Sequence, residues 1–152
     1  MGNCNRIAVV ILLFMAINTS VWASFTLPGV VYRVDHMSTA INDAKDKNIP
    51  ILYLWSDENT TCGLCTAASI DIIEEFKNST VIIYISSKND SDWDKTPNIV
   101  KRSIVSPQAG KYIPKAILLD SENKKVYAII PYERDRNKRK ENLHEINMAI
   151  QK

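Results

Sequence analysis

Apolar runs alternate with amphipathic segments along most of this chain. Residues 49–55 and 80–85 are almost entirely apolar, the pattern of strands that are covered on both faces of a sheet. Shorter apolar stretches predict a first strand within residues 25–34 and a hairpin-like pair at 116–120 and 126–130. The sequence therefore predicts five strands, of which the last two form a hairpin.

Helices are expected between these strands. Residues 37–47 have the spacing of an amphipathic helix, which Asp35 or Ser38 is expected to cap. Three more segments have helical character: 67–77, 98–105 and 134–151. Residues 86–97 are predicted to form a polar loop, in which Trp93 either anchors the loop or borders a binding surface. Because helices alternate with strands, the predicted fold class is α/β, with a mixed central sheet and helices on both faces.

The first 23 residues have the pattern of an export signal. Arg6 is a short basic region, residues 7–17 are apolar and uncharged, and Val21-Trp22-Ala23 offers small residues where a signal peptidase cleaves. Cleavage after Ala23 would leave one domain, residues 24–152, in the periplasm or outside the cell. An uncleaved membrane anchor is the alternative, although the apolar run is shorter than the roughly 20 residues that a spanning helix needs.

Composition and charge change this picture little. The 152 residues are 45% hydrophobic and 24% charged, and the formal net charge of +2 gives no argument for a nucleic-acid partner. That length suits one domain with a real core, and no repeat or Gly/Ser-rich linker divides the chain. Cleavage of the signal would remove Cys4 and leave Cys62 and Cys65 as the only cysteine pair. The exported protein would carry this pair in a compartment where disulfides persist.

The segment Cys62-Gly63-Leu64-Cys65 carries the clearest chemistry. It follows a buried strand and a polar loop and precedes a predicted helix, so both thiols lie at a helix N-terminus. Side chains three residues apart share a helix face, within a small distortion of disulfide reach. Free N–H groups and the helix dipole favour the thiolate there, the form that reacts in disulfide exchange. Cys62 is therefore the predicted nucleophile, and Cys65 the thiol that resolves the mixed disulfide.

The surroundings of these cysteines resemble the thioredoxin superfamily over most of the chain after the signal. Three segments carry the resemblance: Pro50-Ile51-Leu52-Tyr53-Leu54-Trp55 before the cysteines, residues 110–119 around Ile113-Pro114, and the approach from Ala40 to Pro50. The resemblance implies a thioredoxin fold in which Pro114 is cis and the Ile113 backbone pairs with an extended substrate segment. Gly63 and Leu64 are expected to contact substrate as well. No cofactor or metal is implied, because the dithiol itself carries two electrons.

Three departures from the thioredoxin pattern concern the redox direction, not the type of chemistry. Leu54 stands where many thioredoxins have a buried acid; Asp57 or Glu58 is the available substitute, although both are expected in a solvated loop. Thr61 replaces the usual tryptophan before the first cysteine. The dipeptide Gly63-Leu64 has neither the proline of reducing thioredoxins nor the histidine of strong oxidants.

Other interpretations of the cysteine pair stay open. An inert structural disulfide is one, although the loop that it closes is too short to restrict the unfolded chain much. Half of a metal site is another, but zinc needs about four ligands, and His36 and His144 are distant in sequence. A copper-carrying relative would typically have a longer cysteine spacing and a dedicated histidine.

The sequence thus predicts an exported thiol–disulfide oxidoreductase. Its expected partners are cysteine-containing exported proteins and a membrane or soluble redox partner that resets the pair, with no nucleic acid. The alternative is a non-catalytic thioredoxin-like binding or chaperone module whose dithiol is vestigial. An exposed and reactive Cys62 would favour the enzyme over the binding module.

Overall fold

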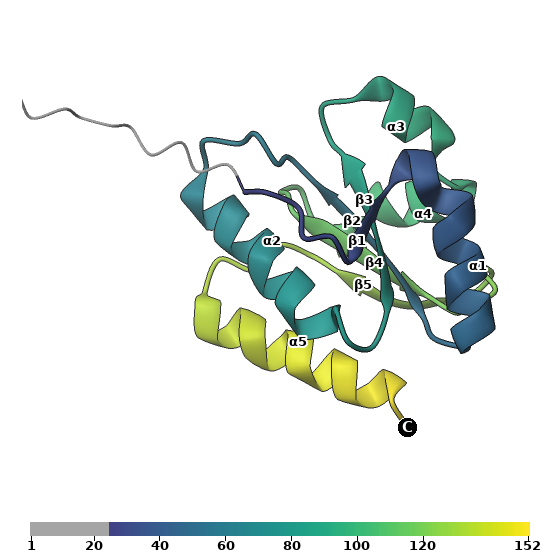
Figure 1. Ribbon diagram of the computed structural model, residues 1–152. Helices are drawn as coiled ribbons and strands as arrows, with labels where there is room; N and C mark the ends of the chain where they lie inside the picture. Colours follow the sequence, from purple (N-terminus) through teal and green to yellow (C-terminus); the bar gives the residue numbers. More distant parts are fainter. Residues whose placement is uncertain (1–24) are drawn as a thin grey trace, which may run out of the picture.

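Five strands form one sheet in the computed structural model, which describes residues 25–152 (Figure 1). The strands are β1 (Val31–Arg33), β2 (Ile51–Ser56), β3 (Val81–Ser86), β4 (Lys115–Leu119) and β5 (Val126–Ile130). Their order across the sheet is β1-β3-β2-β4-β5. The first three are parallel, whereas β4 is antiparallel to β2 and β5 is antiparallel to β4. The predicted mixed sheet with a terminal hairpin is therefore confirmed.

Helices cover both faces of this sheet, as predicted. They are α1 (Met37–Lys47), α2 (Gly63–Phe76), α3 (Asp90–Lys95), α4 (Asn98–Ile104) and α5 (Arg136–Ile150). Two short 3₁₀ turns, Val34–His36 and Pro107–Ala109, complete the regular structure of the described residues. Figure 1 shows α2 and α5 side by side on one face, with α1 and α4 on the other. The α/β class is confirmed.

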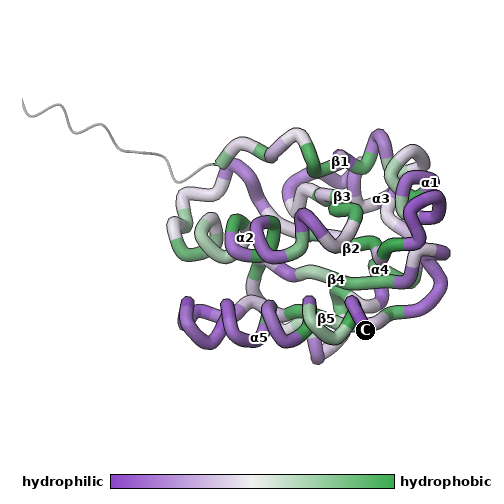
Figure 2. Tube along the Cα trace, turned by 60° about the horizontal axis from the view of Figure 1, so that its bottom comes forward, coloured by the Kyte–Doolittle hydropathy of each residue, from purple (hydrophilic) through white to green (hydrophobic). Residues whose placement is uncertain are grey.

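Each face of the sheet has its own apolar core, because side chains of a strand point alternately to opposite faces. In β2, Ile51 and Tyr53 belong to the core under α1 and α4, whereas Leu52 and Leu54 belong to the core under α2 and α5. All four side chains are fully buried. Figure 2 shows the consequence: the central strands are apolar, whereas α5 is largely hydrophilic. The unbroken apolar run of β2 thus places this strand at the centre, and its end determines where the cysteines lie.

The starts of α1 and α2 agree with the sequence-based expectation, but the cap of α1 differs. Helix α2 begins at Gly63 with Cys62 as its N-cap, so the expectation that the dithiol lies at a helix N-terminus is confirmed. Neither Asp35 nor Ser38 caps α1 with its side chain; the 3₁₀ turn Val34–His36 leads directly into the helix instead. The start of α2 brings both cysteines into one helical turn.

The predicted loop 86–97 contains a helix, α3, and that expectation was wrong. Asn89 caps it, since its side-chain oxygen accepts a hydrogen bond from the N–H of Ser91 at 3.0 Å. Asp90 and Asp92 lie in the first turn, where the helix dipole favours negative charge. Polar residues that suggested a loop are therefore the capping residues of a short helix that carries Trp93.

The predicted signal, residues 1–23, lies outside the described part of the chain. From residue 25 to residue 152, no helix is both long enough and apolar enough to cross a membrane.

Candidate active site

Cys62 and Cys65 form a disulfide at the start of α2, with their Cα atoms 5.3 Å apart. Cys62 is the N-cap residue, and its Sγ accepts a hydrogen bond from the N–H of Cys65 at 3.2 Å. The Cys62 carbonyl accepts the first helical bond, from the N–H of Thr66 at 3.0 Å. The N–H donor and the helix dipole both favour negative charge on the Cys62 sulfur. This position suits a sulfur that reacts as a thiolate.

The dithiol lies at the surface of the described molecule. Cys62 and Cys65 are half-buried, and Gly63 and Leu64 between them are exposed. Leu64, a large apolar side chain, is 49% exposed. A Cβ atom built on Gly63 would meet nothing within 4 Å, so its outer side is open. A partner chain can therefore approach the sulfur atoms over Gly63 and Leu64.

Hydrogen bonds fix the loop between β2 and the cysteines. Asp57 Oδ1 accepts from the N–H of Asn59 at 2.9 Å, which closes an Asx turn. Thr60 Oγ1 accepts from the N–H of Cys62 at 3.1 Å. Asp57 is only 8% exposed, so the expectation that it is solvated was wrong. Its carboxylate is buried because it holds the turn that leads to Cys62.

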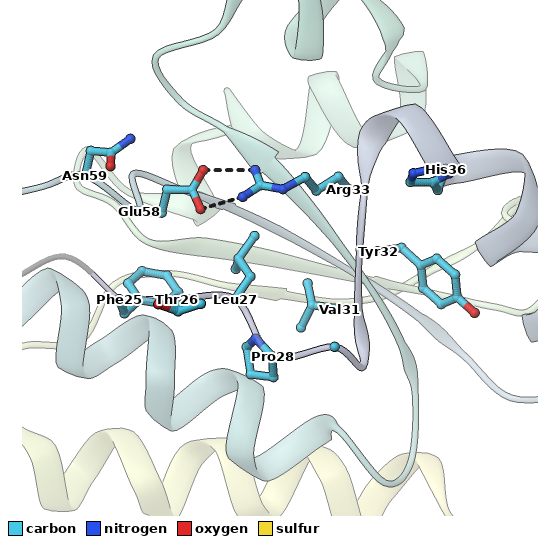
Figure 3. A pocket seen from close by; sticks show the side chains of 11 residues that line it. Phe25, Thr26, Leu27, Pro28, Val31, Tyr32, Arg33, His36, Glu58 and Asn59 are labelled. Atoms are coloured by element: carbon cyan, nitrogen blue, oxygen red, sulfur yellow. Dashed lines mark hydrogen bonds and ion pairs between the residues drawn. The ribbon is translucent and has the colours of Figure 1, made fainter.

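An ion pair ties the same loop to β1, as Figure 3 shows. The Arg33 guanidinium donates to both carboxylate oxygens of Glu58, at 2.9 and 2.8 Å. The Tyr84 hydroxyl accepts from the N–H of Glu58 at 2.8 Å and donates to the Ser56 carbonyl at 3.0 Å. This pair borders a cavity of about 620 Å³ beside the segment 25–29. Arg33 and Glu58 pair with each other there, and the pair holds the loop against β1.

A pair of buried hydroxyl groups lies next to Cys65, and the sequence analysis missed it. Ser69 Oγ donates to the Cys65 carbonyl at 3.1 Å, and Ser56 Oγ is 2.8 Å from Ser69 Oγ. Because Ser69 has one hydroxyl hydrogen, Ser56 is the donor within the pair. Both residues are 0% exposed. Leu54, at the position of the acid in many thioredoxins, is fully buried in the core instead.

The Ile113–Pro114 peptide bond is cis, and it lies at the same edge of the sheet as the dithiol. Trp55 of β2 is opposite Lys115 of β4 in the antiparallel register. One residue further along, Pro114 falls opposite Ser56, the end of β2 from which the loop to Cys62 departs. Pro114 is buried and Ile113 half-buried. The cis-proline segment thus lies beside the end of β2 from which the chain leads to the cysteines.

The polar side chains of the described residues offer little to a metal ion. Across 25–152, no group of three or more His, Cys, Asp or Glu side chains is placed to hold one. His144 Nδ1 lies 3.2 Å from a carboxylate oxygen of Glu75, on α5 and α2 respectively. His36 lines the cavity of Figure 3.

Comparison with known proteins adds no relative: no protein-family model matches the chain, and no curated protein matches it. The fold class and the kind of site are therefore argued from the strand order and from the position of the cysteine pair. The strand order, with helices on both faces, is consistent with a thioredoxin-like α/β fold. The Cys-x-x-Cys pair at the start of α2 is consistent with a redox dithiol and compatible with an oxidoreductase.

Proposed function

We propose that this chain is a member of the thioredoxin superfamily and an exported thiol–disulfide oxidoreductase. The observation that carries the proposal is the Cys62–Cys65 disulfide in the first turn of α2, with the half-buried Cys62 at the N-cap. A buried structural disulfide would not need the open surface over Gly63 and Leu64. The short loop that it closes would also stabilise the fold little.

The exchange needs only this pair of cysteines. A substrate thiolate attacks Cys62 Sγ, the Cys62–Cys65 bond breaks, and Cys65 leaves as a thiolate. A second substrate thiolate then attacks the substrate sulfur bonded to Cys62, and Cys62 leaves as a thiolate. Two electrons pass from the substrate dithiol to the protein, and the substrate acquires the disulfide. The reverse sequence reduces a substrate disulfide, with Cys62 as the attacking group.

Substrate binding is assigned to Ile113, Pro114, Gly63 and Leu64. An extended substrate segment would pair with the Ile113 backbone, which supplies main-chain hydrogen bonds without demanding a particular side chain. The register supports this assignment, because Pro114 continues β4 opposite the end of β2. Leu64, 49% exposed between the two cysteines, offers apolar contact to the same segment.

Location and partners follow from the proposed export. Residues 1–23 would direct the chain out of the cytoplasm, with cleavage after Ala23, into a compartment where substrates carry disulfides. The substrates would be cysteine-containing exported proteins. A membrane or soluble redox partner would restore the pair after each turnover.

Mixed-disulfide trapping tests the proposal. The chain from Ser24, as Cys65→Ser or Cys62→Ser, is incubated with oxidised glutathione at pH 7, and the adduct is followed by mass spectrometry. We expect Cys65→Ser to form the adduct about tenfold faster than Cys62→Ser, because only Cys62 lies at the helix N-cap. Equal rates, similar to that of free cysteine, would overturn the proposal and favour a binding module with a vestigial dithiol.

A further inference from the structure

A second cavity, of about 320 Å³, lies at the carboxyl ends of β2 and β3, on the α1–α4 face of the sheet. Trp55 from the end of β2 and Trp93 from α3 form two of its walls. Their ring centroids are 6.3 Å apart, and the ring planes are inclined by 53°. The end of α4 and the first residue of β4 close the other sides. The cavity therefore borders the segment that holds the cis peptide bond.

Lys115, the first residue of β4, lines this cavity with a buried ammonium group. Its residue is only 6% exposed, and its Nζ donates to the Ile104 carbonyl at 2.9 Å. The same atom lies 5.2 Å from the centre of the Trp55 ring. Within residues 25–152, no carboxylate forms an ion pair with it, and burial lowers the pKa of Lys115. An ammonium group has three donors, so this one retains capacity for an acceptor.

Ser87 adds a hydroxyl group with no partner. Its Oγ is inaccessible to solvent and makes no hydrogen bond within the described residues, although Ser87 lines the cavity. Buried hydroxyl groups are nearly always hydrogen-bonded in native proteins, because an unmade bond is costly. The cavity is thus lined, between two aromatic rings, by a cation with unused donors and by Ser87, whose hydroxyl group no internal hydrogen bond holds away from a ligand. That combination suits a carboxylate on a short apolar stem.

Asp90 is the opposing charge at this cavity. It lines the cavity from the start of α3, but its side chain is exposed. Charges in solvent interact far more weakly than charges in the protein interior. The buried ammonium group of Lys115 therefore gives the cavity a preference for a negatively charged group. The exposed Asp90 only weakens that preference.

We propose that this cavity binds an acidic side chain of the substrate polypeptide, with the carboxylate on Lys115 Nζ and Ser87 Oγ and the methylene groups on Trp55 and Trp93. The inference rests on the proposed function, because it requires a polypeptide paired with Ile113. Lys115 follows Ile113 by two residues, about 7 Å along an extended chain. An aspartate or glutamate near the substrate cysteine is therefore within reach of the cavity.

Exchange with cysteine peptides tests this preference. Each seven-residue peptide carries one cysteine as a 2-thiopyridyl disulfide and one glutamate or glutamine, placed in turn at each flanking position. The reduced protein's Cys62 thiolate attacks the peptide sulfur and releases pyridine-2-thione, which is measured by absorbance. Cys65 then attacks Cys62 Sγ and releases the peptide as a thiol. The two electrons come from the protein dithiol.

We expect glutamate to react about tenfold faster than glutamine in at least one position, the effect of one charge-assisted hydrogen bond. Lys115→Met should reduce that ratio to about one, because methionine fills a similar apolar volume but carries no charge. Lys124→Met is the matched control. Lys124 lies in the β4–β5 turn with a side chain that is 75% exposed, so its loss removes the same charge and should preserve the ratio.

Ser87→Ala is a second variant, which keeps the test decisive if Lys115→Met does not fold. It removes a hydroxyl group without an internal partner, so we expect a folded protein with a smaller glutamate preference. Equal glutamate and glutamine rates at every position would overturn the inference. The proposed function would not be affected, because the peptides would still exchange. No exchange with any peptide or with glutathione would overturn the proposed function, and the substrate subsite with it.

Discussion

The Sγ atom of Cys62 accepts a hydrogen bond from the N–H of Cys65 at 3.2 Å, where helices usually carry an oxygen of serine, threonine, aspartate or asparagine. The sulfur that is proposed to react is thus also the cap of α2. Ionisation of this sulfur strengthens the cap, because a charged acceptor makes the stronger hydrogen bond. Reactivity and helix stability are coupled at this one atom.

Substitution of Cys62 separates these roles. In reductant at pH 5, we expect Cys62→Ser to be at least as stable as the reduced wild type, because serine is a favoured N-cap residue. We expect Cys62→Ala to be less stable than Cys62→Ser by about 1 kcal/mol. Urea unfolding followed by circular dichroism measures both differences. Equal stability of the two variants would show that the side chain at this position does not cap α2.

The sequence predicted single residues well where the chemistry is local. Spacing alone predicted that Cys62 and Cys65 share a helix end, and their disulfide confirms the pairing. The Ser56–Ser69 hydrogen bond was missed because it depends on how α2 lies over β2. One local pattern pointed to it: Ser69 is four residues after Cys65, on the same face of the helix. The buried state of Asp57 was missed for a similar reason, since a short polar segment does not reveal its own turn.

At the scale of elements, α2 is held on the sheet by its neighbour α5 as well as by the core. Arg139 of α5 donates to Asp71 Oδ2 of α2, through Nε at 3.0 Å and Nη2 at 2.5 Å. The two side chains are only 6% and 9% exposed. Arg139 also donates to the Glu133 carbonyl at 2.7 Å. This buried pair fixes the helix whose first turn carries the dithiol.

Removal of one partner of the Asp71–Arg139 pair should therefore lower the free energy of unfolding strongly. We expect Asp71→Ala to lower the free energy of unfolding by about 3–5 kcal/mol, because it leaves the buried guanidinium of Arg139 without its counter-charge. Glu74→Ala, on the same helix, breaks the exposed Glu74–Lys77 pair and should cost at most about 1 kcal/mol. Urea unfolding of both variants measures the contrast. A similar small loss in each would contradict a stabilising role for the buried pair.

The sequence predicted most elements from their apolar period but not all of their ends. The strands and four of the helices lie where the pattern indicated them. Helix α3 was missed because it has only six residues, none of them buried, and is defined by the Asn89 cap. The start of α2 was predicted from the position of the cysteines after a strand and a polar loop, and the cap at Cys62 confirms it.

At the scale of the whole molecule, two cores on one sheet bury tyrosine residues deeply. Tyr53 and Tyr84 are both 0% exposed, one in each core. Burial raises the pKa of each phenol well above its ordinary range. Alternation of strands and helices predicted these two layers. It did not determine the strand order, which depends on how each helix crosses the sheet.

The buried phenols make stability fall at high pH. Above about pH 10 the unfolded chain releases phenolic protons that the folded chain retains, so the free energy of unfolding declines by up to about 1.4 kcal/mol per pH unit for each tyrosine. We expect Tyr53→Phe and Tyr84→Phe each to reduce this slope between pH 10 and 11.5. Tyr127→Phe is the control, since that ring is 48% exposed. Stability that stays constant or rises over this range would contradict the burial of both phenols.

The most direct test of disulfide exchange through Cys62 and Cys65 is an equilibrium redox titration against glutathione. It would use the chain from Ser24, with Cys62→Ser as the control. We expect a reversible two-electron transition, with a midpoint between the roughly −270 mV of thioredoxin and the roughly −120 mV of strong periplasmic oxidants. Cys62→Ser should show no such transition. A wild-type pair that stays in one state across the whole range would contradict a catalytic dithiol.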